Sequence, residues 1–168
     1  GVALAAARLG CHAYVYMPRS TPSVKQEAVR RHGGDHVKIV LTGDSYDAAA
    51  AAAHEFADER GLTFVHAYDD LATMGGQGTL ADEVVMSGQG NFTRVYLQIG
   101  GGGLASACAC WFKKYWPDCK CIGVEGTTQA SMKQAVEHGK RVVLHDIDVF
   151  CDGTAVRQAG ENTYPLCK

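Results

Sequence analysis

Short apolar segments alternate along this chain with longer segments of helical periodicity, and this alternation restricts the fold more than any other feature. Runs rich in β-branched or aromatic residues predict strands at 13–17, 37–41, 63–66, 94–99 and 120–125. Apolar residues at helical spacing predict helices at 24–32, 45–60, 79–86, 104–115 and 131–138. Strands and helices that alternate in this way are typical of βαβ units, so we predict an α/β fold with mainly parallel sheets.

The composition is that of a globular protein without a strong net charge. Of the 168 residues, 46% are hydrophobic and 20% are charged, and the formal net charge is −2. Such a chain has no field that would attract a polyanion, so we do not expect a nucleic-acid partner. The apolar runs are shorter than the ~20 residues that a membrane span needs, and no charged-then-apolar leader opens the chain. We therefore expect no membrane partner and a cytoplasmic location.

The seven cysteines favour a reducing compartment, because their number is odd and they lie in predicted helices and strands. The pairs Cys108-x-Cys110 and Cys119-x-Cys121 suggest a zinc site by their spacing alone. On a helix, however, two residues subtend roughly 200°, so the thiols of Cys108 and Cys110 would face in opposite directions. We therefore interpret these residues as ordinary buried cysteines and predict no metal site there.

The stretch YLQIGGGGLASA, residues 96–107, leads from a predicted strand through four consecutive glycines into a predicted helix. Main-chain N–H groups without Cβ atoms can converge there on an anion at the positive end of the helix dipole, which predicts a phosphate site. A tight turn that binds no ligand is the simpler alternative.

The same glycines also fit a loose dinucleotide fingerprint, Gly100-x-Gly102-x-x-Ala105. Glu125 lies near the place where such a domain carries a ribose-binding carboxylate. Against a nicotinamide cofactor, the fingerprint usually follows the first strand of its domain, whereas three predicted strand–helix pairs precede it here. The motif alone is therefore weak evidence for that cofactor.

Eight segments carry a more specific pattern: GVALAAARLG, YVYMPRSTPSVKQEAVRRHGG, LTGDSYDAA, GGQGTLADEV, YLQIGGGGLASA, CIGVEG, DGTAV and GENTYPLC. In this order they resemble the threonine dehydratase (threonine ammonia-lyase) family of pyridoxal-phosphate enzymes, over nearly the whole chain. The resemblance implies a three-layer αβα core of fold type II. It also implies that Gly100, Gly101, Gly102, Gly103 and the amide of Leu104 hold the 5′-phosphate of pyridoxal phosphate.

The function implied by this resemblance is that of a lyase. It would deaminate L-threonine, and L-serine as well, by β-elimination to a 2-oxo acid and ammonia, in the first step of isoleucine biosynthesis. The implied partners are a small amino-acid substrate and further copies of the chain in a homo-oligomer, in the cytoplasm or, in a plant or alga, the plastid. Serine dehydratases and serine racemases share much of the pattern and are an alternative. A nicotinamide-binding module or a non-catalytic anion-binding domain is the alternative of another class.

The resemblance places the reactive groups of the enzyme outside this chain. The family's Schiff-base lysine belongs to a Phe-Lys segment upstream of Gly1, and no lysine here has that context, so we assign no catalytic residue. We expect a fragment truncated at both ends and inactive alone, with residues 1–68 as the small domain and 69–168 as part of the large domain.

Glu125 is a weak candidate for a metal ligand. It resembles a carboxylate that helps to bind a divalent cation in serine racemase relatives, but Ser131 stands where a second carboxylate would be needed. A glutamate at the end of a strand, with no metal, is the preferred interpretation.

Overall fold

The computed structural model describes residues 1–168, which form two compact units, Gly1–Phe64 and Val65–Lys168. The roles predicted for residues 1–68 and 69–168, as small domain and partial large domain, stay a prediction. None of the helices combines the length and the apolar character that a membrane span requires.

In chain order the elements are α1 (Val2–Leu9), β1 (Ala13–Met17), α2 (Ser23–Gly33), the 3₁₀ turn η1 (Gly34–His36), β2 (Val37–Leu41), α3 (Tyr46–Arg60), α4 (Leu71–Met86), β3 (Arg94–Gln98), α5 (Gly103–Tyr115), β4 (Lys120–Val124), α6 (Ser131–His138) and α7 (Thr163–Cys167).

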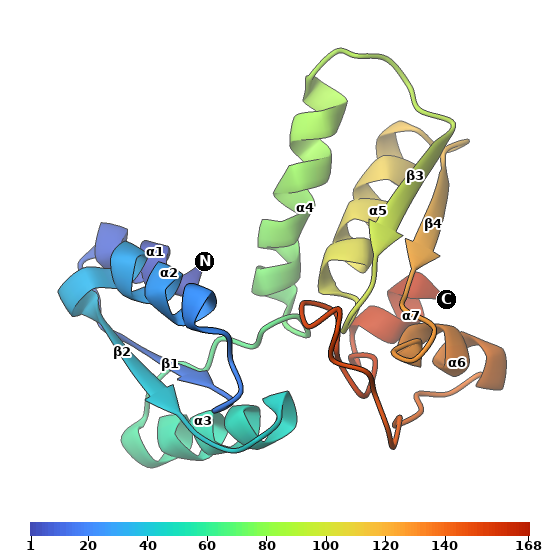
Figure 1. Cartoon of the computed structure of the whole chain (residues 1–168). Helices are drawn as coiled ribbons and strands as arrows, with labels where there is room; N and C mark the ends of the chain where they lie inside the picture. The colour runs from blue at the N-terminus through green and yellow to red at the C-terminus, as the bar shows by residue number, and fades with distance from the viewer. The chain divides into compact units, whose positions relative to one another are not determined.

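The first unit has three layers, with its sheet in the middle (Figure 1). Strands β1 and β2 pair in parallel, in a register that sets Ala13 opposite Val37. Helices α1 and α2 pack together on one face of this sheet, and α3 covers the other face. Helices cover both faces, as is usual for parallel sheets, and the two strands are apolar except at Lys38 of β2.

Helix α3 forms from an alanine-rich segment because both of its ends are capped. The Ser45 Oγ accepts a hydrogen bond from the amide of Ala48 at 3.2 Å, which satisfies one of the free N–H groups of the first turn. Gly61 ends the helix in the left-handed conformation, with a φ of 62°. Between these ends Ala49 and Ala57 are buried, so the helix presents a stripe of small side chains to the sheet.

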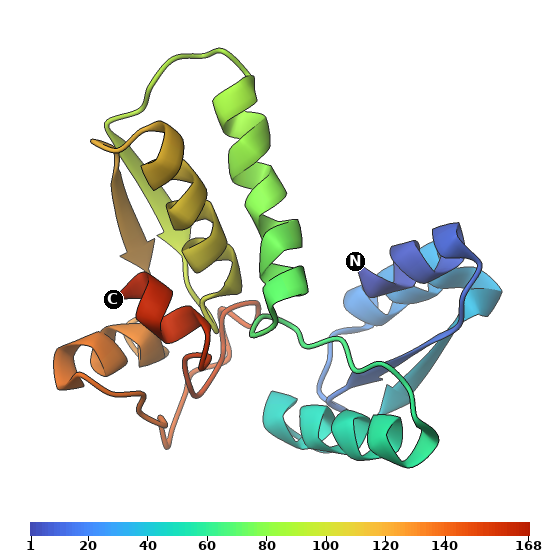
Figure 2. The same cartoon turned by 180° about the vertical axis from the view of Figure 1, so that it is seen from behind.

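In the second unit, β3 and β4 also pair in parallel, and α5 packs against them with α4 at its side (Figure 2). Its hydrophobic core comes mainly from β3 and α5 and is closed by α4, α6 and the segment before α7. The buried members include Ala81, Leu97, Ile99, Cys108, Phe112, Trp116, Met132 and Ala159. The α/β class and the parallel pairing predicted from the sequence are confirmed.

The strand predicted at 63–66 is wrong. These residues belong to no ladder, and they connect the end of α3 to the turn before α4. An apolar run becomes a strand only where a second strand lies beside it, and none does here. The apolar character has another cause, because the Phe64 ring packs against the His54 ring of α3 with centroids 4.6 Å apart.

The helix predicted from residue 79 begins earlier, at Leu71. Its N-cap is Asp70, whose Oδ1 accepts a hydrogen bond from the amide of Thr73 at 2.9 Å. Glycines in the segment GGQG suggest a break, but the interior of this helix tolerates them. A Cβ atom at Gly78 would lie 3.7 Å from Ala107 Cβ of α5, an ordinary van der Waals contact, so packing does not require glycine there.

Candidate functional site

The glycine loop, defined here as Gly100, Gly101, Gly102 and Gly103, lies between the end of β3 and the first turn of α5. The amide of Ile99 donates a last sheet hydrogen bond to Val124 at 2.8 Å. Beyond that residue the chain leaves the sheet, and Gly102 adopts a φ of 98°. The loop therefore occupies the carboxyl end of a parallel strand, which is the usual place for ligands in α/β proteins.

Five consecutive main-chain amides of this region have no acceptor within the chain. They are the N–H groups of Gly100, Gly101, Gly102, Gly103 and Leu104. Three of these residues, from Gly101 to Gly103, are buried. Leaving a buried amide without a partner costs roughly 1–3 kcal/mol, so the region is suited to a ligand with several acceptor oxygens.

Unlike these amides, the carbonyl groups of Gly101, Gly102 and Gly103 all accept hydrogen bonds from the protein. Gly101 O accepts from the amide of Gly160 at 3.1 Å and from Thr163 Oγ1 at 2.5 Å. Gly102 O accepts from the amide of Ser106 at 2.9 Å, and Gly103 O accepts from Ser106 Oγ at 3.2 Å.

These hydrogen bonds determine where the free amides point. In a trans peptide the C=O and the following N–H point in opposite directions. Because the carbonyls of Gly102 and Gly103 are turned into α5, the amides of Gly103 and Leu104 point out of the N-terminus of that helix. The helix dipole is positive there, so the amides and the dipole together favour an anion.

Close packing requires glycine at Gly101, Gly102 and Gly103, whether or not a ligand binds. A Cβ atom on Gly101 would overlap the Tyr68 ring, and one on Gly103 would lie 2.6 Å from the Tyr68 carbonyl oxygen. A Cβ atom on Gly102 would lie 2.6 Å from Met132 Cε. The evidence for a ligand therefore comes from the unpaired amides and not from the glycines as such.

The whole chain, residues 1–168, matches the family described as pyridoxal-phosphate dependent enzymes. The chain belongs to this family. It is 46% identical over 168 residues to the biosynthetic L-threonine dehydratase of Burkholderia multivorans, and 41% identical to the chloroplastic biosynthetic threonine dehydratase 1 of Solanum lycopersicum. The match covers 100% of this chain but 33% and 27% of those two relatives, so the chain spans about a third of their length.

Solved structures of pyridoxal-phosphate dependent enzymes have the same fold. The processed form of threonine deaminase isoform 2 from Solanum lycopersicum superimposes with a TM-score of 0.89 at 40% identity, over 99% of this chain and 47% of that one. Maize serine racemase superimposes with a TM-score of 0.88 at 27% identity, over 99% of this chain and 49% of that one. The predicted fold type II core is thus confirmed.

Family membership, and not the order of elements, decides against the nicotinamide alternative. The strand–helix pairs before the glycine loop do not count against that cofactor, contrary to the prediction, because β3 is the first strand of its own sheet. A loop after the first strand is where a dinucleotide fingerprint belongs. The match to pyridoxal-phosphate dependent enzymes over the full chain is what separates the two cofactors.

Glu125, the weak metal candidate, caps α6. Its Oε1 accepts a hydrogen bond from the amide of Met132 at 2.9 Å, and its Oε2 accepts one from the amide of Lys133 at 2.8 Å. Burial raises the pKa of Glu125 more than these two hydrogen bonds lower it. The structure contains no group of three or more His, Cys, Asp or Glu side chains that could hold a metal ion.

The cysteines of α5 face in opposite directions, as the helical spacing predicts. Cys108 is buried and donates a long hydrogen bond from Sγ to Gln77 O at 3.8 Å, whereas Cys110 is exposed. Burial raises the pKa of the Cys108 and Cys121 thiols, which favours their neutral form. A metal ligand would need the thiolate, so this environment agrees with an ordinary core cysteine.

Sequence reasoning missed two residues that hold the glycine loop, Tyr68 and Thr163. Tyr68 lies against Gly101 and Gly103, and the Thr163 side chain is fully buried beneath Gly101. Thr163 belongs to the segment GENTYPLC, which entered the argument only through a family resemblance. A periodic pattern could not reveal either residue, because both contacts join segments that are far apart along the chain.

Proposed function

We propose that this chain forms the phosphate-binding part of a pyridoxal-phosphate dependent threonine dehydratase. The observation that carries this proposal is the run of five amides, from Gly100 to Leu104, that have no acceptor within the chain. A cofactor phosphate would supply both the acceptor oxygens and the negative charge that this helix N-terminus favours. The names of the relatives at 46% and 41% identity support threonine as the substrate.

The contribution of this chain to the reaction would be to bind and orient the cofactor. When bound, pyridoxal phosphate supplies an electron sink for the charge that develops at the substrate's α-carbon. The amides of Gly100, Gly101, Gly102, Gly103 and Leu104 would fix the phosphate end of the cofactor. The amides of Gly102, Gly103 and Leu104 share their peptides with carbonyl groups that the protein already holds, so these three amides need not reorganise on binding, which is favourable for affinity.

The reactive lysine would lie in a part of the full-length protein outside these residues, and 1–68 and 69–168 would be its small domain and part of its large domain. In this chain Lys25, Lys113, Lys114, Lys133 and Lys140 are all exposed. Treatment of residues 1–168 with pyridoxal phosphate and borohydride should therefore give only substoichiometric adducts, distributed over several lysines, by mass spectrometry. A stoichiometric adduct at one lysine would contradict this part of the proposal.

The substrate is tested on the full-length protein with L-threonine and L-serine. We expect 2-oxobutanoate and ammonia from threonine, and a smaller yield of pyruvate from serine. The likeness to maize serine racemase favours a second candidate, which would convert L-serine into D-serine. Chiral chromatography of the same reaction separates the two: accumulation of D-serine without 2-oxobutanoate would favour the racemase.

If the full-length protein forms neither 2-oxobutanoate nor D-serine but still binds phosphate, it is a non-catalytic anion-binding protein. Titration with inorganic phosphate, followed by amide chemical shifts of the glycine loop, detects that binding directly.

For the assembly we propose a homo-oligomer, and sedimentation of the full-length protein measures its mass. For location we propose the cytoplasm, or a plastid in a plant or alga, since three of the relatives have chloroplastic names.

A further inference from the structure

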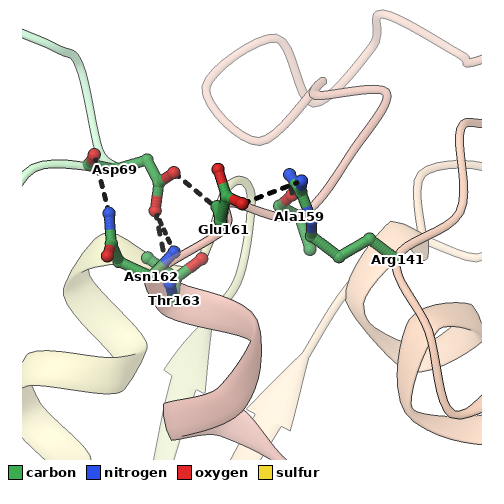
Figure 3. A network of polar contacts seen from close by, with 6 residues as sticks. All are labelled: Asp69, Arg141, Ala159, Glu161, Asn162 and Thr163. Atoms are coloured by element: carbon green, nitrogen blue, oxygen red, sulfur yellow. Dashed lines mark hydrogen bonds and ion pairs between the residues drawn. The ribbon is translucent and has the colours of Figure 1, made fainter.

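Asp69 binds the start of α7 from a distant part of the chain (Figure 3). Its Oδ2 accepts a hydrogen bond from the amide of Glu161 at 2.7 Å. Its Oδ1 accepts hydrogen bonds from the amides of Asn162 at 2.9 Å and Thr163 at 3.2 Å. A carboxylate that satisfies three amides at the start of a helix acts as an N-cap, a role that a sequence neighbour normally fills. Asp69 therefore fixes the position of the first turn of α7.

A second side chain, Arg141, contacts the same segment from a different direction (Figure 3). Its Nη1 donates to Ala159 O at 3.5 Å, and its Nη2 lies 3.9 Å from the Glu161 carboxylate. Both distances are long, and the Glu161 side chain is 80% exposed, so solvent screens this ion pair. Asp69 is thus the stronger polar anchor of the segment that leads into α7.

The first residue of α7 passes this restraint on to the glycine loop. Thr163 is fully buried, and its Oγ1 donates to Gly101 O at 2.5 Å. The amide of Gly160, in the segment before α7, donates to the same oxygen at 3.1 Å. A carbonyl oxygen has two lone pairs, so these two donors occupy its full capacity.

The orientation of one peptide group follows from these two hydrogen bonds. Gly101 C=O and Gly102 N–H belong to the same planar trans peptide and point in opposite directions. Because Thr163 and Gly160 hold the carbonyl on their side, the N–H of Gly102 must point away from α7. Glycine has no side chain to restrict this peptide, so its orientation depends on such external contacts.

We propose that Asp69 is a positioning residue for the anion-binding amides of the glycine loop. It acts through α7: Asp69 fixes Thr163, Thr163 fixes the carbonyl of Gly101, and that carbonyl sets the direction of the Gly102 amide. The inference rests on the proposed function, because it takes the phosphate of pyridoxal phosphate as the anion. It differs from a purely structural role, in which Asp69 would stabilise α7 without affecting the ligand.

The test compares two ligands that differ only in the phosphate. The full-length protein is titrated with pyridoxal phosphate and with pyridoxal, and the ratio of the two dissociation constants reports the phosphate contribution alone. In Asp69→Asn one acceptor is replaced by an N–H donor that faces main-chain amides. We expect pyridoxal phosphate to bind about tenfold more weakly and pyridoxal to bind as before, as for the loss of one to two hydrogen bonds to an anion.

Asp70→Asn is the matched control. Asp70 is the adjacent residue and also caps a helix, but it caps α4 through the amide of Thr73 and has no contact with α7. We expect this variant to leave the ratio of the two dissociation constants unchanged. A tenfold loss of affinity for pyridoxal phosphate alone in Asp70→Asn would show that any lost helix cap has this effect, and it would overturn the inference.

Substitutions of Thr163 test the same pathway one step closer to the loop and do not require Asp69→Asn to fold. Thr163→Val removes the donor to Gly101 O but keeps the main-chain amide that Asp69 binds, and Thr163→Ser keeps the hydroxyl. We expect the valine variant to lose affinity for pyridoxal phosphate only, and the serine variant to retain it. Equal losses for both ligands, or none, in Asp69→Asn and Thr163→Val would overturn the inference.

The failure of this inference and that of the proposed function are distinguishable. Wild-type protein that binds pyridoxal and pyridoxal phosphate equally would contradict the proposed phosphate site itself. Wild-type protein that prefers pyridoxal phosphate, together with variants whose preference is unchanged, would contradict only the role of Asp69.

Discussion

Glu125 Oε2 accepts a hydrogen bond from the main-chain amide of Lys133 at 2.8 Å, across the start of α6. The other carboxylate oxygen accepts from Met132, so this side chain serves two of the free amides of the first helical turn. Burial nevertheless raises the pKa of Glu125 above its ordinary value of 4.5. The helix cap therefore stands in an environment that penalises its charge.

A pH dependence of stability follows for Glu125. Because the pKa of Glu125 is higher in the folded state than in the unfolded state, the folded state holds the proton more tightly. Glu125 therefore stabilises the fold below pH 4.5, and this contribution is lost as the pH rises through the folded pKa. Glu125→Gln cannot titrate. The difference in the free energy of unfolding, wild type minus Glu125→Gln, should therefore fall in urea titrations as the pH rises from 4.5 through the folded pKa. A difference that rises with pH would contradict the burial effect.

The thiols should fall into two classes of reactivity. Cys11, Cys110 and Cys151 are exposed, whereas burial raises the pKa of Cys167 to about 11. With a disulfide reagent near neutral pH, we expect fast labelling of the three exposed thiols and slow labelling of Cys167, since only the thiolate reacts. Peptide mapping after a short pulse measures this.

Two serine variants serve as controls for the thiol assignment. Cys167→Ser should leave the amplitude of the fast phase unchanged, and Cys110→Ser should lower it by one thiol. Rapid labelling of Cys167 in the folded protein would show that this thiol is more accessible than the structure indicates.

The sequence was sufficient to predict features with local causes. The glycine run between β3 and α5 and the helix predicted at 45–60, which is α3 in the structure, both depend on residues within a few positions of one another. For the same reason the bounds of β1, β2 and α6 agree with the periodicity. The family resemblance added the cofactor, which no periodic pattern contains.

The features that the sequence did not reveal depend on contacts between distant segments. Helix α4 begins at Leu71 and not after GGQG, because packing against α5 outweighs the low helix propensity of glycine. The support of the glycine loop by Thr163 spans 62 residues. Such contacts appear only once the chain is folded, so neither propensity nor spacing could identify them.

Gly102→Ala should strongly destabilise the second unit. The substitution meets two penalties: a φ of 98°, which residues other than glycine rarely adopt, and a Cβ atom 2.6 Å from Met132 Cε and 2.8 Å from Thr163. Gly139→Ala is the matched control, since its φ is 71° but nothing lies within 4 Å of the added atom.

The difference in unfolding free energy between these two alanine variants measures the cost of the contacts of the new Cβ atom with Met132 and Thr163. We expect Gly139→Ala to cost about 1 kcal/mol of unfolding free energy and Gly102→Ala about 1–3 kcal/mol more. Urea denaturation of residues 1–168 measures both. Equal losses would mean that Met132 and Thr163 relax without cost around the new methyl group.

Two fully buried serines should respond in opposite ways to removal of the hydroxyl group. Ser106 Oγ donates to Gly103 O at 3.2 Å, whereas Ser131 Oγ is buried with no hydrogen-bond partner. Removing a hydroxyl that is already unpaired relieves a desolvation penalty, so Ser131→Ala should raise the unfolding free energy by about 1 kcal/mol. Ser106→Ala should lower it by a similar amount, because Gly103 O loses a donor.

The pair of variants also bears on Glu125, since Ser131 begins the helix that Glu125 caps. If Ser131→Ala stabilises the protein and leaves the pH dependence assigned to Glu125 unchanged, the hydroxyl does not support the carboxylate. A loss of stability in Ser131→Ala would instead show that the hydroxyl has a partner in solution, and ordered water would be the first candidate to examine by nuclear magnetic resonance.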